Sequence, residues 1–184
     1  MQMTFKEFIN IIENNTNNTN NTEKAEFILV IGGSASGKNY IFEKNFKGIP
    51  LVDNDEITKR LSGGDFEKAR KLISKATEEA NKMLTKAFEK NESIGQVSTG
   101  SNFKGVLNKF IKAKSYGMKC TLVLIDTDIK KAIKRNKERA EAGKQGLIPD
   151  WKVEKTNNTA RETFKELQKS EYKQYIDESK IIKN

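Results

Sequence analysis

Histidine is absent from this sequence of 184 residues. Without an imidazole, the chain cannot use histidine as a general base and cannot assemble a Ser-His-Asp triad. It also cannot build any zinc site that needs a histidine ligand. These classes of catalysis and metal binding are therefore excluded.

Cysteine is nearly absent as well, because Cys120 is the only one. It stands in the apolar run 120–125, so no intrachain disulfide forms and a buried core thiol is expected. No apolar run approaches the roughly 18 residues of a membrane-spanning helix, and the opening MQMTFKEFINII is too acidic and too short in its apolar part for a signal peptide. We expect a cytoplasmic protein with no membrane partner.

Arginine is scarce although the chain is basic. Its 34 lysines and arginines outnumber 25 acidic residues and give a net charge of +9. The arginines are Arg60, Arg70, Arg135, Arg139 and Arg161. The charge favours anionic partners such as nucleotides or nucleic acid, although many lysine-rich cytosolic proteins bind no polymer.

The length is that of one domain with a single core. Residues 1–13 predict a short amphipathic helix, Thr4 to Glu13, whose Phe5, Phe8 and Ile12 would dock on the domain or on a protein partner. Residues 14–24 are rich in Asn and Thr and predict a linker. Residues 25–184 form the predicted domain.

Short apolar runs alternate with longer helical patterns from Glu26 onward, which predicts an α/β fold. The sheet is expected to be mainly parallel, with four to five strands and helices on both faces. Strands are predicted at 27–31, 49–52, 93–98 and 118–125, and helices at 39–46, 65–90, 103–116, 129–142 and 150–169. A last strand is predicted around Tyr175 and Ile176.

A glycine-rich loop follows the first predicted strand and opens a helix. It fits the pattern G-x-x-x-x-G-K and consists of Gly32, Gly33, Ser34, Ala35, Ser36, Gly37 and Lys38. In this context the backbone N–H groups and the helix N-terminus cradle a phosphate chain, and the lysine reaches the outer phosphates. A flexible Gly/Ser turn is the alternative, but it does not account for Lys38.

Asn39 stands where the pattern expects Ser or Thr. A hydroxyl there would bind Mg²⁺, while an asparagine carbonyl oxygen is a longer, neutral donor, so magnesium binding is weakened and not excluded. The third strand ends in Gln96-Val97-Ser98-Thr99 without an aspartate. The acidic metal anchor must therefore lie elsewhere, and Asp53 is the candidate.

Asp53 and Asp55 follow the second predicted strand, at the edge where open α/β sheets hold ligands. If the strand geometry continues, both carboxylates point to one side. One of them could instead cap the helix that begins near Glu56. We expect Asp53 to be the cap or a group behind the substrate, and Asp55 to be the base that takes a proton from an attacking hydroxyl.

Arg135 and Arg139 lie four residues apart on one face of a predicted helix, and a glycine-containing segment follows them. Phosphoryl transfer needs positive charge placed over the transferring group by a closing element. Residues 135–150 therefore predict a lid over the phosphates. A solvated charged helix is the alternative interpretation.

Four segments together resemble the zeta-toxin and polynucleotide-kinase group of P-loop kinases, small kinases often met in bacteria and phages. They are GGSASGK, VDNDEITKR, the turn STGS, and RNKERAEAGKQGLIP, and the match covers about residues 27–167. The resemblance implies that Asp55 activates the acceptor hydroxyl, that Ser98, Thr99 and Gly100 lie at the acceptor site, and that Arg135 and Arg139 hold phosphates. In zeta toxins an acidic residue precedes the Thr-Gly turn, whereas this chain has Val97.

The sequence thus predicts a kinase that uses ATP and Mg²⁺ to phosphorylate a hydroxyl group. A nucleic acid end or modified base, a nucleotide sugar and a small metabolite all remain open as acceptors, and the charge tilts the expectation towards nucleic acid. The alternative is a nucleotide-binding protein that no longer turns over and serves as a regulatory or partner-binding module.

Overall fold

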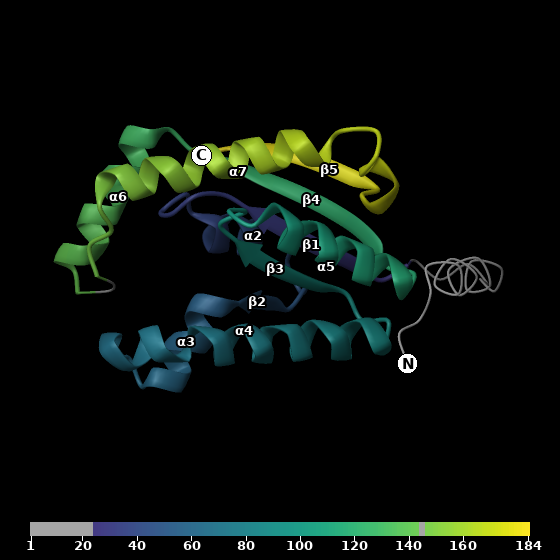
Figure 1. Cartoon of the computed structure of the whole chain (residues 1–184), viewed down its shortest axis with the longest axis horizontal. Helices are drawn as coiled ribbons and strands as arrows, with labels where there is room; N and C mark the ends of the chain where they lie inside the picture. The colour runs from purple at the N-terminus through teal and green to yellow at the C-terminus, as the bar shows by residue number, and fades with distance from the viewer. Residues whose placement is uncertain (1–23, 144–145) are drawn as a thin grey trace.

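The computed structural model of the chain describes residues 24–143 and 146–184 (Figure 1). The predicted N-terminal helix, and the predicted linker up to residue 23, lie outside the described residues. Five parallel strands form one sheet in the order β2-β3-β1-β4-β5. The α/β architecture expected from the sequence is therefore confirmed, with a sheet that is parallel throughout.

The strands are short apolar segments, and the central ones are covered on both faces. Five of the six residues of β1 are buried, which agrees with its unbroken apolar sequence FILVI. Strand β1 pairs with β3 from Phe27 opposite Ile94 to Ile31 opposite Ser98. The strands are β1 (Glu26–Ile31), β2 (Leu51–Asp53), β3 (Ile94–Ser98), β4 (Lys119–Asp126) and β5 (Glu178–Lys183).

The last strand lies farther along the chain than predicted. Tyr175 belongs to a 3₁₀ turn, η1 (Lys173–Tyr175), and β5 begins only at Glu178. Buried Ile176 joins the main core cluster, while β5 itself is mostly exposed. Tyr175 and Ile176 are therefore apolar because they pack against the core beside β5, and not because they form a strand.

Six α-helices connect and cover these strands in the part of the chain that the structure describes. One face of the sheet packs on helices that contribute Ala80, Phe110 and Phe164 to the main core cluster, and the other face packs on Ile41 and Phe42. The helices are α2 (Lys38–Asn45), α3 (Asn54–Ser62), α4 (Phe66–Glu89), α5 (Phe103–Ser115), α6 (Ile129–Glu141) and α7 (Asp150–Leu167).

All five strands point the same way, so their carboxyl ends meet at one edge of the sheet. The loop after β1, the start of α3 after β2, the turn after β3 and the start of α6 after β4 all lie at this edge (Figure 1). Every segment that the sequence singled out for chemistry is attached to this edge.

Candidate active site

The P-loop is the turn that joins β1 to α2. Gly37 takes φ +85° and caps α2 without a side-chain bond, so its left-handed backbone favours glycine. A Cβ placed on Gly33 would lie 2.2 Å from Cγ of Asn157. Glycine is therefore needed at one position for its backbone conformation and at the other for close packing against α7.

Helix α7 holds the loop from one side. The Ser34 N–H donates to Oγ1 of Thr156 over 3.0 Å, and the side-chain amide of Asn157 donates to the Ser34 carbonyl over 3.2 Å. Asn157 is almost fully buried. Sequence reasoning missed both α7 residues.

The residues that directly follow β4 and β5 also hold the loop. Thr127 Oγ1 and Asn184 Nδ2 both donate to the carbonyl of Ser36, over 3.0 and 2.7 Å. The backbone N–H of Asn184 in turn donates to the carbonyl of Asp126 over 3.1 Å. Two further residues that the sequence did not point to thus position the P-loop.

Lys38 lies at the centre of the site. Its ammonium donates to the carbonyls of Gly32 and Gly33, each over 2.9 Å. Burial lowers the pKa of Lys38 to about 8, while Asp55 and Asp53 act in the opposite direction and Arg139 adds to the lowering. Two carboxylates and an arginine predicted from separate segments therefore all act on the same lysine.

Asp53 is the N-cap of α3. Its Oδ1 accepts the N–H of Asp55 over 2.8 Å, and its Oδ2 accepts the amide of Asn39 over 2.5 Å. The expectation that strand geometry continues to Asp55 is wrong, because Asn54 already begins the helix. The predicted start of this helix near Glu56 is accordingly too late.

Asp55 stands in the first turn of α3 and is exposed at its surface. Withdrawal from water, followed by the charge of Asp53, raises the pKa of the Asp55 carboxyl, and Lys38 partly opposes the rise. A carboxylate with a raised pKa is better matched to accepting a proton from a hydroxyl than an ordinary surface aspartate.

Asn39 and Asp53 can serve a nucleotide-bound cation only together with other ligands. The described residues contain no group of three or more His, Cys, Asp or Glu side chains that could hold a metal ion. Mg²⁺ at nucleotide sites is bound by one or two protein oxygens plus phosphates and waters. The pair therefore fits a metal shared with phosphates, and not an all-protein site.

Arg135 reaches the P-loop from α6. Its Nη2 donates to Oδ1 of Asn184 over 3.2 Å. Its Nη1 is buried, has no hydrogen-bond partner among the described residues, and lies 3.6 Å from where a Cβ on Gly37 would stand. A buried guanidinium donor without a partner beside a phosphate loop calls for an anionic ligand.

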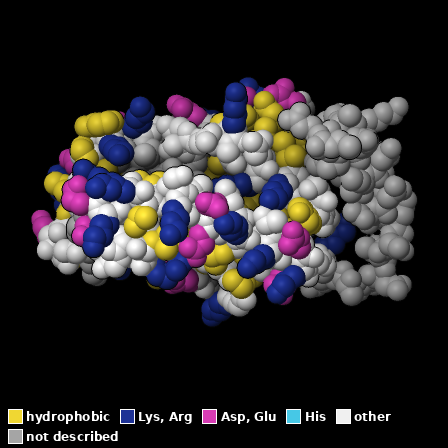
Figure 2. Space-filling model, turned by 60° about the horizontal axis from the view of Figure 1, so that its bottom comes forward, with side chains coloured by type: hydrophobic (Ala, Val, Ile, Leu, Met, Phe, Trp, Pro, Cys, Tyr) yellow, Lys and Arg dark blue, Asp and Glu magenta, His cyan; other side chains and the backbone are white. Residues whose placement is uncertain are grey.

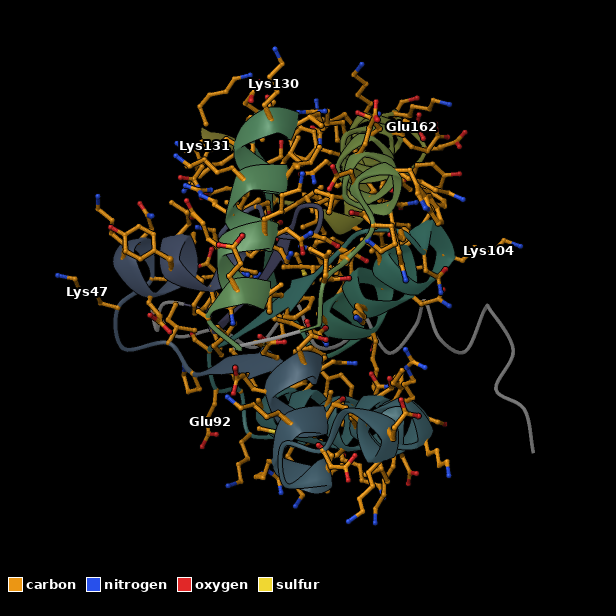
Figure 3. All side chains as sticks on the ribbon, turned by 90° about the vertical axis from the view of Figure 1, so that its left-hand side faces the viewer. Lys47, Glu92, Lys104, Lys130, Lys131 and Glu162 are labelled. Atoms are coloured by element: carbon orange, nitrogen blue, oxygen red, sulfur yellow. The ribbon has the colours of Figure 1, made fainter. Side chains whose placement is uncertain are left out.

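The rest of the predicted lid is only partly described. Arg139 is exposed and influences Lys38 electrostatically. The buried amide of Asn136 donates to the carbonyl of Ile148 over 2.7 Å, which ties the end of the segment back to α6. The outward side of α6 carries Lys130 and Lys131, which point away from the body (Figure 3).

The turn after β3 lies next to the P-loop. The Gly32 N–H donates to the Ser98 carbonyl over 3.2 Å, and Thr163 of α7 donates to the Gly100 carbonyl over 2.7 Å. Gly100 takes φ +72° and packs against Ile31. Thr99 is exposed, and its hydroxyl accepts from Ser101. The predicted acceptor residues thus adjoin the predicted phosphate site.

Several solved structures share this fold. A chain of the PezAT chromosomal toxin-antitoxin system of Streptococcus pneumoniae is 18% identical with a TM-score of 0.65, and the match covers 100% of this chain and 80% of that one. A putative kinase from Chloroflexus aurantiacus is 13% identical with a TM-score of 0.61, covering 75% of this chain and 80% of that one.

A chain of the Pnkp1/Rnl/Hen1 RNA repair complex is 16% identical with a TM-score of 0.63, and the match covers 82% of this chain but 48% of that one. The AvrRxo1-ORF1:-ORF2 complex, crystallised with ATP, contains a chain that is 16% identical with a TM-score of 0.59, covering 87% of this chain and 54% of that one. No protein-family model and no curated protein matches the sequence.

These matches confirm the predicted resemblance at the level of the fold. The chain shares its α/β fold with chains of a toxin-antitoxin system and of an RNA repair complex, and with a putative kinase. In the part of the chain that the structure describes, no helix is both long and apolar enough to span a bilayer.

Proposed function

We propose that the protein is a kinase that transfers the γ-phosphoryl group of ATP to a hydroxyl group. The observation that carries the proposal is the convergence on Lys38 of groups from two other segments: Asp53 and Asp55 after β2, and Arg139 from α6. A flexible Gly/Ser turn would not gather a phosphate-binding lysine, a carboxylate of raised pKa and an arginine in one place.

The proposed reaction is an in-line displacement. The Asp55 carboxylate accepts the proton of the acceptor hydroxyl, whose oxygen forms a bond to the γ-phosphorus while the bond from that phosphorus to the bridging oxygen breaks. The products are ADP and a phosphate monoester. Lys38, Arg135 and Arg139 stabilise the charge on the transferring group and on the leaving oxygen.

The P-loop residues Gly32 to Lys38, followed by Asn39, would bind the phosphates through their backbone N–H groups. The unpaired Nη1 of Arg135 beside Gly37 supports an anion at this position. Asn39 and Asp53 would hold Mg²⁺, which neutralises phosphate charge when bound. Ser98, Thr99 and Gly100 would face the acceptor, since their turn adjoins the P-loop.

A nucleotide-binding module without turnover is the second candidate, and one contact favours it. The amide of Asn39 donates to Asp53 Oδ2, while Oδ1 already accepts the N–H of Asp55. Both oxygens of the carboxylate that would anchor the metal are therefore engaged within the chain.

ADP release with Mg²⁺ against a panel of hydroxyl acceptors distinguishes the two candidates. The kinase hypothesis predicts acceptor-dependent ADP release that is lost in Lys38→Ala and strongly reduced in Asp55→Asn. Lys104→Ala is the matched control, because Lys104 points outward from α5 (Figure 3) and should leave the rate unchanged. ATP binding by calorimetry without ADP release for any acceptor would favour the binding module.

A further inference from the structure

A groove of about 410 Å³ runs between helices α4 and α5. The two helices flank β3 on the same side of the sheet (Figure 1). Ser98 at the end of β3 and Asn102 at the start of α5 line one end, and Lys112 lines the other. The groove therefore leads directly away from the proposed acceptor turn, and its size is that of a small-molecule site.

The residues that line the groove carry positive charge without negative charge, and apolar atoms make up most of its exposed surface. Its polar residues include three asparagines, two threonines, one serine and two lysines, and none of its lining residues is acidic. Leu84, Phe88 and Val106 provide apolar surface. A charged ligand bound here would have to be an anion.

Lys109 is the half-buried cation in this groove. It makes no hydrogen bond or ion pair among the described residues, and burial alone lowers its pKa. Nine of the described lysines pair with a carboxylate, such as Lys114 with Asp177 and Lys119 with Glu178, and Lys109 is not among them. A desolvated ammonium with no counter-ion is costly, and an anionic ligand would offset that cost.

Lys112 closes the far end of the groove. Its ammonium crosses from α5 to donate to Thr85 Oγ1 of α4 over 2.6 Å and keeps two further donors. Lys109 lies seven residues after Asn102, which is about 10 Å along the helix at 1.5 Å per residue. An anion between the two lysines would therefore sit one small-molecule length from the acceptor turn.

We infer that the α4–α5 groove binds a phosphate group carried by the acceptor, so that the substrate is a small phosphorylated compound with a free hydroxyl. This inference rests on the proposed kinase function for the reacting hydroxyl, and on Lys109 and Lys112 for the phosphate. The three asparagines supply donors and acceptors for the ligand's remaining polar groups.

The groove favours a small molecule over a nucleic acid strand. Sites for single strands combine a continuous basic track with exposed aromatic rings that stack on bases. The one aromatic residue that lines the groove, Phe88, is buried. On the face that carries α4, basic side chains are interspersed with acidic ones and form no continuous stripe (Figure 2).

The test measures binding separately from turnover. Ribose 5-phosphate and ribose are titrated by calorimetry into the protein saturated with a non-hydrolysable ATP analogue, which keeps the P-loop occupied. The variants are Lys109→Gln, Lys112→Gln and the matched control Lys104→Gln, which lies on the same helix and points into solvent (Figure 3).

We expect ribose 5-phosphate to bind at least tenfold more tightly than ribose, and Lys109→Gln to remove most of that difference. Lys112→Gln should remove part of it, and Lys104→Gln none. The affinity for the ATP analogue should stay the same in all variants. Equal binding of the two sugars, or an unchanged preference in Lys109→Gln, would overturn the inference.

A second measurement follows the Lys109 ammonium by NMR. Bound phosphate should raise its pKa, because an anion favours the charged form. If a 5′-hydroxyl hexanucleotide binds in the groove while ribose 5-phosphate does not, the ligand is nucleic acid and the inference is wrong. If the protein phosphorylates only neutral acceptors, the phosphate site in the groove is refuted while the kinase function stands. If ribose 5-phosphate binds but no acceptor gives ADP release, the groove site stands while the kinase function is refuted.

Discussion

The P-loop and the α4–α5 groove differ in where their polar groups find partners. Around the P-loop, contacts from α7, Thr127 and Asn184 hold the backbone, and Arg135 Nη1 is left as a donor without a partner among the described residues. Along the groove, polar side chains line an open surface, and Lys109 has no hydrogen-bond or ion-pair partner in the part of the chain that the structure describes. The fold thus preorganises the P-loop, whereas the positive charge of Lys109 in the groove is neutralised only when the proposed ligand binds.

Removing the P-loop lysine should separate the two regions most clearly. We expect Lys38→Ala to lower turnover about 10³-fold or more and to weaken ATP binding, because its charge acts on both the bound phosphates and the transition state. Ribose 5-phosphate binding in the groove should change little. Steady-state rates and calorimetry with each ligand measure the three quantities, and a matching loss of groove binding would show that the regions are not independent.

Asp55 is the proposed base, and its replacement should change neither the affinity for ATP nor the affinity for the groove ligand. We expect Asp55→Asn, which is nearly isosteric, to lower turnover about 10²- to 10⁴-fold while the affinity for ATP stays within a few-fold. Rates and calorimetry on the same preparation give both numbers. If Asp53→Asn is instead the inactive variant and Asp55→Asn the mild one, the two roles are exchanged.

The raised pKa of Asp55 adds a pH dependence with a definite sign. A protonated carboxyl cannot act as a base, so the rate should fall with decreasing pH at values above the ordinary aspartate pKa of 3.8. The folded state binds this proton more tightly than the unfolded state, so the stabilisation it gives is complete below pH 3.8 and is lost as pH rises through the raised pKa. Asp55→Asn should therefore be at least as stable as the parent at pH 7, and thermal melts from pH 4 to 8 measure this.

The sequence predicted the elements of the fold well, because buried parallel strands are uninterrupted apolar runs and α4 is long and strongly patterned. It misplaced β5, where only Ile182 and its neighbour Ile181 are apolar in an exposed edge strand. Tyr175 and Ile176 carried the stronger apolar signal, but they pack beside the sheet. Exposed edge strands lack the pattern that identifies buried ones.

The sequence predicted the site residues that belong to a local motif. It missed the residues that contact the site from distant positions in the chain. Lys38 and Gly37 follow from the loop pattern, whereas Thr156 meets Ser34 across 122 positions. One signal was available: Asn157 stands on the buried stripe of α7 between Val153 and Ala160. A polar residue on an apolar helix face needs a partner inside the protein.

Replacing Asn184 tests how far the preorganisation of the P-loop depends on the residue that follows the edge strand β5. It accepts from Arg135 and donates to Ser36. We expect Asn184→Ala to raise the KM for ATP about 2- to 10-fold, the scale of one or two hydrogen bonds, and to leave groove binding unchanged. Asn184→Asp, which keeps the acceptor for Arg135, should recover much of this loss. An equal defect in both variants would assign the effect to Ser36 alone.

The smallest expected effect compares two helix caps, one inside the site and one outside it. Asp53 caps α3, and Asp65 caps α4 by accepting the N–H groups of Glu67 and Lys68. Replacing either by alanine should cost about 1 kcal/mol of unfolding free energy, or roughly 2–4 °C in Tm.

The two caps should differ in their effect on Mg²⁺. Asp53→Ala should also raise the Mg²⁺ concentration needed for half-maximal ADP release, because it removes the proposed anchor beside Asn39. Asp65→Ala should leave that concentration unchanged, since among the described residues its carboxylate contacts only the start of α4 and Lys68. Equal magnesium requirements in the two variants would show that Asp53 acts only as a helix cap and does not anchor the metal. The metal would then be held by phosphates and Asn39 without it.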